Sequence, residues 1–118
     1  MTISKNMTTI KIDKDIITSI NVFTVDPSKQ QMLVEVLVET AEQVWNLQDG
    51  FVSATIHKSL DGKKVVNYLQ WKSKEAFEKR LNDPQAIINM NKVLSMARAS
   101  GNLYEVVFTD SKVVINGE

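Results

Sequence analysis

No cysteine occurs among the 118 residues of the chain, and His57 is the single histidine. The lack of cysteine excludes disulfides, thiolate nucleophiles and metal sites built from thiolates. A metal centre with several histidine ligands is also excluded within one chain.

Net charge and long apolar runs are lacking as well. Lysine and arginine together number 14, and so do aspartate and glutamate. Nucleic-acid and membrane surfaces favour an excess of basic residues, so we expect neither as a partner. No apolar run approaches the roughly 20 residues that span a bilayer, and the first residues lack the apolar core of a signal peptide. We predict a cytoplasmic protein with one domain, because the length suits a single fold.

The most informative stretch that is present is VVNYLQW at residues 65–71, followed by KSKEAF. Its β-favouring residues predict a strand, and Ser73 with Glu75 predicts the start of a helix. Side chains alternate along a strand, so Asn67, Leu69 and Trp71 share one face. A buried amide and a buried indole N–H need hydrogen-bond partners, which either the protein or a ligand supplies.

The flanking residues predict an α+β, ferredoxin-like βαββαβ fold, with one four-stranded antiparallel sheet and helices on one face. Asp26-Pro27 and Asp83-Pro84 each predict a helix start, and Ser100-Gly101 predicts a helix end. The predicted strands are residues 16–25, 51–59, 63–71 and 103–115; the predicted helices are 27–46, 73–82 and 84–101.

The chain is divided into a tail (1–15), one domain (16–110) and a C-terminal strand extension or tail (111–118). The first 15 residues are interpreted as a mobile arm, with an added edge strand at 8–12 as the alternative. The sheet face without helices needs a cover, so we predict a homodimer in which two such faces pack together.

Asp61-Gly62 is a strong hairpin signal that also sets the register of the two strands around it. It predicts three pairs on one face: Ile56 with Asn67, Ala54 with Leu69, and Val52 with Trp71. This face is the more apolar one, so we predict that the helices cover it. Phe51 and Tyr68 are predicted on the opposite face.

These segments resemble the antibiotic biosynthesis monooxygenase family. The resemblance rests on GFVS at residues 50–53, HKSLDG at 57–62, VVNYLQW at 65–71, SKEAF at 73–77, Asp83-Pro84 and LYEVV at 103–107. It implies a dimeric α+β barrel and, most closely, a cofactor-free oxygenase that converts an anthrone to a quinone with O2. No cofactor and no metal are then expected, and the partners are a small aromatic substrate, O2 and a second copy of the chain.

The resemblance also implies a pocket between sheet and helices, lined by an asparagine and a tryptophan four residues apart. Asn67 and Trp71 match these positions and are predicted to be catalytic. The family's pocket tyrosine falls at Phe77, so a tyrosine-based proton transfer is not available here. Predicted substrate contacts are Asn21, Phe23, Ile56, Leu69 and Phe77.

Other interpretations stay open. Asn67 could bond to backbone, and Trp71 could serve only the core. A solvated helix face is predicted for Lys72, Lys74, Lys79 and Arg80. The protein could be a non-catalytic ligand-binding dimer. A haem-binding or haem-degrading relative is a further alternative, but the expected histidine on the second helix is missing between residues 73 and 99.

Overall fold

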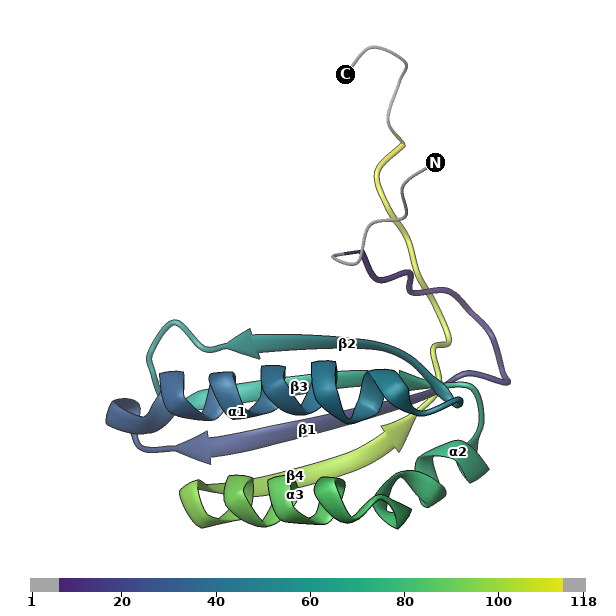
Figure 1. The fold of residues 1–118 in the computed structure, drawn as a ribbon. Helices are drawn as coiled ribbons and strands as arrows, with labels where there is room; N and C mark the ends of the chain where they lie inside the picture. Colours follow the sequence, from purple (N-terminus) through teal and green to yellow (C-terminus); the bar gives the residue numbers. More distant parts are fainter. Residues whose placement is uncertain (1–6, 114–118) are drawn as a thin grey trace.

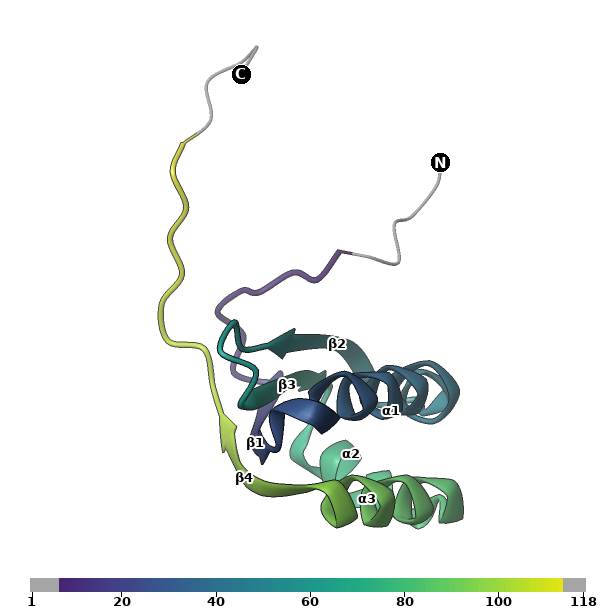
Figure 2. The same ribbon diagram turned by 90° about the vertical axis from the view of Figure 1, so that its left-hand side faces the viewer.

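The computed structural model describes residues 7–113. Its four strands form one antiparallel sheet in the order β2-β3-β1-β4. All helices lie on one face of this sheet (Figures 1 and 2). The elements are β1 (Ile17–Val25), α1 (Gln30–Gln43), β2 (Phe51–Lys58), β3 (Lys64–Trp71), α2 (Lys74–Lys79), α3 (Pro84–Met96) and β4 (Ala97–Tyr104), with short 3-10 turns at Pro27–Lys29, Trp45–Leu47 and Arg80–Asn82. The predicted α+β, ferredoxin-like fold is confirmed.

Side-chain caps lie where the sequence predicted, although Asp26 caps the 3-10 turn Pro27–Lys29 and α1 itself begins only at Gln30. Asp26 and Asp83 each accept a hydrogen bond from the backbone N–H two residues later, at 2.9 and 2.8 Å. Ser73 Oγ accepts one from Ala76 N at 3.1 Å. These caps satisfy N–H groups that the first helical turn leaves free. The chain therefore turns back over the same sheet face soon after β1 and β3 end.

The hairpin between β2 and β3 turns at Asp61-Gly62 through a four-residue loop at residues 60–63, not through a two-residue turn: Ser59 N donates to Lys64 O at 2.9 Å and Gly62 N to Ser59 O at 3.2 Å. Gly62 adopts a φ of 82°, a backbone conformation that favours glycine. Ile56 pairs with Asn67 and Ala54 with Leu69, as predicted. This register places Asn67 and Leu69 on the helix-covered face.

The register prediction was wrong at the far end of the hairpin. The pairing shifts between Phe51 and Ser53, so Phe51 rather than Val52 lies opposite Trp71. Such a bulge adds one residue to β2 and reverses which side chains face inward. The ring of Phe51 then packs against Trp71 with centroids 5.8 Å apart, while Val52 is 42% exposed. Burying the larger apolar side chain explains the shift.

The last helix and last strand also differ from the prediction. Helix α3 ends at Met96, before Ser100-Gly101, and β4 covers Ala97–Tyr104 rather than residues 103–115. Residues 105–113 contain no strand, and 114–115 lie outside the described residues. Pairing with β1, whose residues from Thr18 to Val25 all have partners in β4, overrides the local signals for a helix end.

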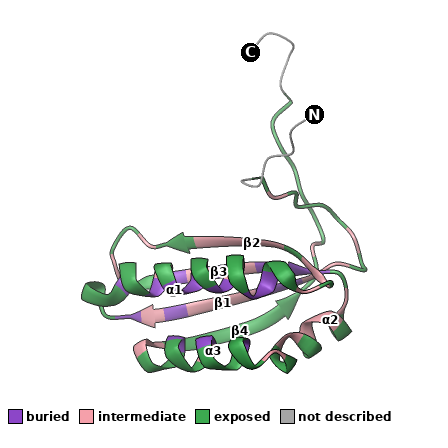
Figure 3. Ribbon diagram, viewed as in Figure 1, coloured by how far each residue is buried: buried purple, intermediate pink, exposed green. Residues whose placement is uncertain are grey.

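Burial is uneven across the sheet (Figure 3). Buried residues lie along β1, β3 and the inward side of α1, whereas β4 is exposed from Arg98 to Tyr104. On the helix-free face, Gln70 Nε2 donates to Thr9 O at 3.2 Å and Thr8 Oγ1 lies 3.3 Å from Thr55 Oγ1. The N-terminal segment therefore crosses one end of that face without forming a strand there. The predicted domain boundaries and the dimeric barrel stay predictions.

Candidate active site

Two asparagine side chains meet at the centre of the helix-covered face. Asn21 of β1 and Asn67 of β3 are register partners. Asn67 is 4% exposed, and within residues 7–113 its Oδ1 has no hydrogen-bond partner. Asn21 is half-buried, and its amide leans over Gly101 of β4. Buried polar groups are nearly always paired, so an unpaired amide oxygen at this position is a candidate ligand contact.

Asn67 interrupts an otherwise apolar core. Its neighbours on the same face of β3 are Val65 on one side and Leu69 on the other, and each belongs to a separate buried cluster. Met90 of α3 packs against both clusters. The amide therefore lies in a water-poor environment, where a hydrogen bond to a developing negative charge is stronger than in water.

Trp71 is fully buried at the end of β3. Trp45, Phe51 and Phe77 surround it edge-on, with ring centroids 5.7, 5.8 and 6.3 Å away. Its indole N–H has no hydrogen-bond partner among the described residues. The ring is thus part of the core, and the unpaired N–H is its one polar group.

Phe77 of α2 links this aromatic cluster to a cation. The guanidinium of Arg80 lies 3.7 Å from the centroid of the Phe77 ring and donates to Phe77 O at 2.9 Å. Partial burial lowers the pKa of Arg80 below its ordinary value. The interpretation of Arg80 as part of a solvated face was therefore wrong. Its spacing of three residues from Phe77 on a helix was the signal for this contact.

Phe23, Leu69 and Ile56 take different positions on the same face. Phe23 and Leu69 are each 3% exposed, one in each apolar cluster. Ile56 is partly buried at the edge of the cluster that contains Phe23. The structure thus brings Asn21, Asn67 and Ile56 into one row across the sheet, while Phe23 and Leu69 flank that row.

A chain of polar side chains, buried at Asn89 and Thr40, joins the two long helices. Sequence reasoning missed this chain. Gln85 donates to Asn89 Oδ1 at 2.7 Å, and Asn89 Nδ2 donates to Thr40 Oγ1 at 2.9 Å. Thr40 Oγ1 in turn donates to Val36 O at 2.7 Å. This chain fixes α3 against α1 above the sheet. A polar residue on the inward stripe of each helix was the available signal.

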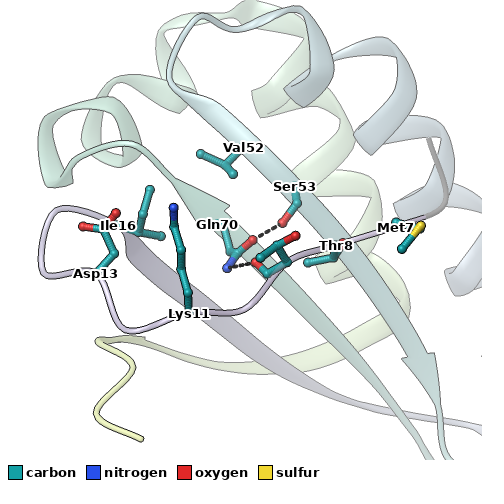
Figure 4. A pocket seen from close by; sticks show the side chains of 9 residues that line it. Met7, Thr8, Lys11, Asp13, Ile16, Val52, Ser53 and Gln70 are labelled. Atoms are coloured by element: carbon teal, nitrogen blue, oxygen red, sulfur yellow. Dashed lines mark hydrogen bonds between the residues drawn. The ribbon is translucent and has the colours of Figure 1, made fainter. Parts of the chain in front are cut away.

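Neither Asn21 nor Asn67 lines either of two surface hollows. One, of about 410 Å³, lies between the N-terminal segment and β2 beside Gln70, as Figure 4 shows. The other, of about 680 Å³, runs along β2 beside α1. Of the predicted site residues, Ile56 alone borders either of these two hollows. Neither hollow opens beside Trp71.

Comparison with known proteins identifies the family. Residues 16–86 match the family described as "Antibiotic biosynthesis monooxygenase". The chain is 40% identical over 100 residues to the tetracenomycin-F1 monooxygenase of Streptomyces glaucescens. The matched region covers 85% of this chain and 89% of that protein. The chain belongs to the antibiotic biosynthesis monooxygenase family. It is a monooxygenase, as predicted, and the non-catalytic alternative is set aside.

Solved structures of antibiotic biosynthesis monooxygenases and related oxygenases share the fold. The ActVA-Orf6 monooxygenase of Streptomyces coelicolor, solved with nanaomycin D, matches with a TM-score of 0.74 and 27% identity over 82% of this chain and 92% of that one. SnoaB of Streptomyces nogalater, a cofactor-independent oxygenase, matches with a TM-score of 0.71 and 26% identity over 80% and 96%.

Two further observations concern residues 7–113 of this family member. They contain no group of three or more His, Cys, Asp or Glu side chains that could hold a metal ion. None of the helices in that range is both long and apolar enough to cross a membrane.

Proposed function

We propose that the protein is a cofactor-independent monooxygenase that oxidises an electron-rich polycyclic phenol of the anthrone type to a quinone with O2. The observation that carries this proposal is the buried Asn67 amide, whose oxygen has no partner in an apolar core. The relatives of the protein support the substrate class. One is a tetracenomycin-F1 monooxygenase, the ActVA-Orf6 monooxygenase was solved with nanaomycin D, and SnoaB is a cofactor-independent oxygenase.

The reaction converts a CH2 group and O2 into a carbonyl group and water. The acidic substrate loses a proton, and the resulting carbanion gives one electron to O2. The two radicals combine into a C–O bond, and the resulting peroxide anion takes back a proton and loses water to leave the carbonyl. An electron-rich substrate supplies the electrons itself, so the protein's task is to hold the anion in a site from which water is excluded.

Three hydrogen-bonding side chains and four apolar ones have roles in this scheme. The Asn67 amide donates to the oxyanion and accepts from a neighbouring phenol through its unpaired oxygen. The free indole N–H of Trp71 supplies a second donor. Asn21 contacts the substrate from β1, while Phe23, Ile56, Leu69 and Phe77 form apolar walls. Phe77 cannot take up a proton, so the substrate's own acidity carries more of the first step.

Oxygen uptake tests this function directly. The protein is dialysed against a chelator and mixed with dithranol, an anthrone, in an oxygen electrode. We expect catalysed uptake of one O2 per quinone formed, with no added metal or flavin, and no catalysis by heat-denatured protein. Uptake that appears only after a metal or flavin is added contradicts the proposal. A haem titration that shifts the Soret band would instead favour the haem-binding alternative.

We also propose that the protein is a homodimer joined through the helix-free sheet face. Ile20, Val22, Val66 and Tyr68 lie on that face and stay only half-buried in the single chain. An apolar face of this kind favours a second copy over water. Sedimentation analysis is expected to give the mass of two chains, and Val66→Glu is expected to shift it toward one. A wild-type mass of one chain contradicts the dimer.

A further inference from the structure

A glycine occupies the centre of the open edge strand, in the same row as the two amides. Gly101 of β4 pairs with Asn21, which pairs on its other side with Asn67. Glycine weakens the interior of a strand, because it has no side chain to pack and its backbone loses more conformational entropy on folding than that of other residues. The position of Gly101 therefore calls for a reason other than strand formation.

The reason lies in the direction of the Asn21 side chain. A Cβ atom on Gly101 would lie 2.0 Å from Asn21 Oδ1 and 3.0 Å from Asn21 Cγ. The Asn21 amide thus fills the space that any other residue at position 101 would occupy. Because β4 and β3 lie on opposite sides of β1, this amide leans away from Asn67.

Without this arrangement, the side-chain amides of Asn21 and Asn67 would form a hydrogen bond with each other. Register partners on neighbouring strands have Cβ atoms about 4.5–5.5 Å apart, within reach of an amide–amide hydrogen bond. No such bond joins Asn21 and Asn67 in the described structure, and Asn67 Oδ1 is left unpaired. The Asn67 amide therefore stays available to a ligand.

We propose that Gly101 is a positioning residue: its missing Cβ lets Asn21 lean over β4 and so keeps the Asn67 amide free for substrate. The structural part of this inference stands alone, and its effect on catalysis rests on the proposed function. The atoms of Asn21 that a Cβ at position 101 would meet belong to the flexible end of its side chain. Such a Cβ would therefore displace the amide toward Asn67 rather than unfold β4.

The test is Gly101→Ala. We expect kcat to fall about tenfold with little change in KM, because the Asn67 amide must then give up an internal hydrogen bond to stabilise the oxyanion that forms in the transition state. The melting temperature is expected to stay equal or rise. Ser100→Ala, on the opposite face of the same exposed strand, is the control and should match wild type. Gly101→Ser introduces the same Cβ and should repeat the effect if the alanine variant folds poorly.

The Asn21→Ala background separates positioning from a general effect on the strand. In that background Gly101→Ala has no amide to displace, so its effect on kcat should shrink to within about twofold. An equal loss of activity in both backgrounds overturns the proposal.

Side-chain amide resonances give a readout that does not need activity. In Gly101→Ala the NH2 signals of Asn21 and Asn67 should shift and exchange more slowly, because the two groups now bond to each other. Unchanged signals overturn the proposal. Shifted signals in a protein that never oxidises dithranol would support the positioning role while contradicting the proposed function.

Discussion

Asn67→Ala is expected to lower kcat by at least about tenfold and, if the amide is the principal oxyanion donor, by about 10²–10³-fold. The amide is buried between two apolar clusters, which limit the access of water that could replace it. Oxygen uptake with dithranol, measured over a range of substrate concentrations, separates the effects on kcat and KM. Equal kcat in the variant and wild type would remove Asn67 from the site.

The same substitution should not destabilise the fold. A buried polar atom without a partner disfavours folding by about 1–3 kcal/mol, and the alanine removes it. Thr18→Val is the matched control, because Thr18 is 2% exposed and its Oγ1 also lacks a partner within the described residues, yet it lies on the helix-free face. Both variants should unfold at an equal or higher urea concentration, and only Asn67→Ala should lose activity.

Trp71→Ala is expected to have the largest effect on stability. The side chain is fully buried among Trp45, Phe51 and Phe77. Replacing a buried tryptophan by alanine leaves a cavity and costs about 3–5 kcal/mol, a large part of the stability of a small domain. Urea unfolding followed by circular dichroism measures this loss. A loss below about 1 kcal/mol would show that the aromatic cluster does not hold the core together.

Trp71→Phe distinguishes a role in the core from a role in the site. It keeps an aromatic ring and removes the unpaired N–H. Trp45→Phe is the matched control, because Trp45 is 2% exposed and its N–H also lacks a partner in the described structure. Both should lose similar stability, whereas only Trp71→Phe should lower kcat, by about tenfold. Full activity of Trp71→Phe would restrict Trp71 to the core.

The face on which the candidate site lies was predictable from local rules. Alternation along β3 placed Asn67, Leu69 and Trp71 together, and the Asp61-Gly62 turn placed Ile56 opposite Asn67. Both rules need only neighbouring residues and the two-residue period of a strand. The caps at Asp26, Ser73 and Asp83 were predictable for the same reason.

The bulge and the last strand were not predictable in this way. Val52 and Phe51 are both suited to a strand, and the choice of Phe51 depends on the space beside Trp71. Residues 97–99 continue a helical composition, and only the open edge of β1 makes them part of a strand. In each case a distant partner decides between two locally acceptable conformations.

By itself, the sequence determined the order of the elements, the face of each residue on β3 and the resemblance to the monooxygenase family, because these follow from short-range periodicity, turn residues and matching motifs. Only the tertiary structure decided that Asn21 leans over Gly101, that Arg80 lies on Phe77 and that the Asn67 oxygen is left without a partner. Side-chain direction and hydrogen-bond satisfaction depend on residues from several strands and helices at once, and no single stretch of the chain contains that information.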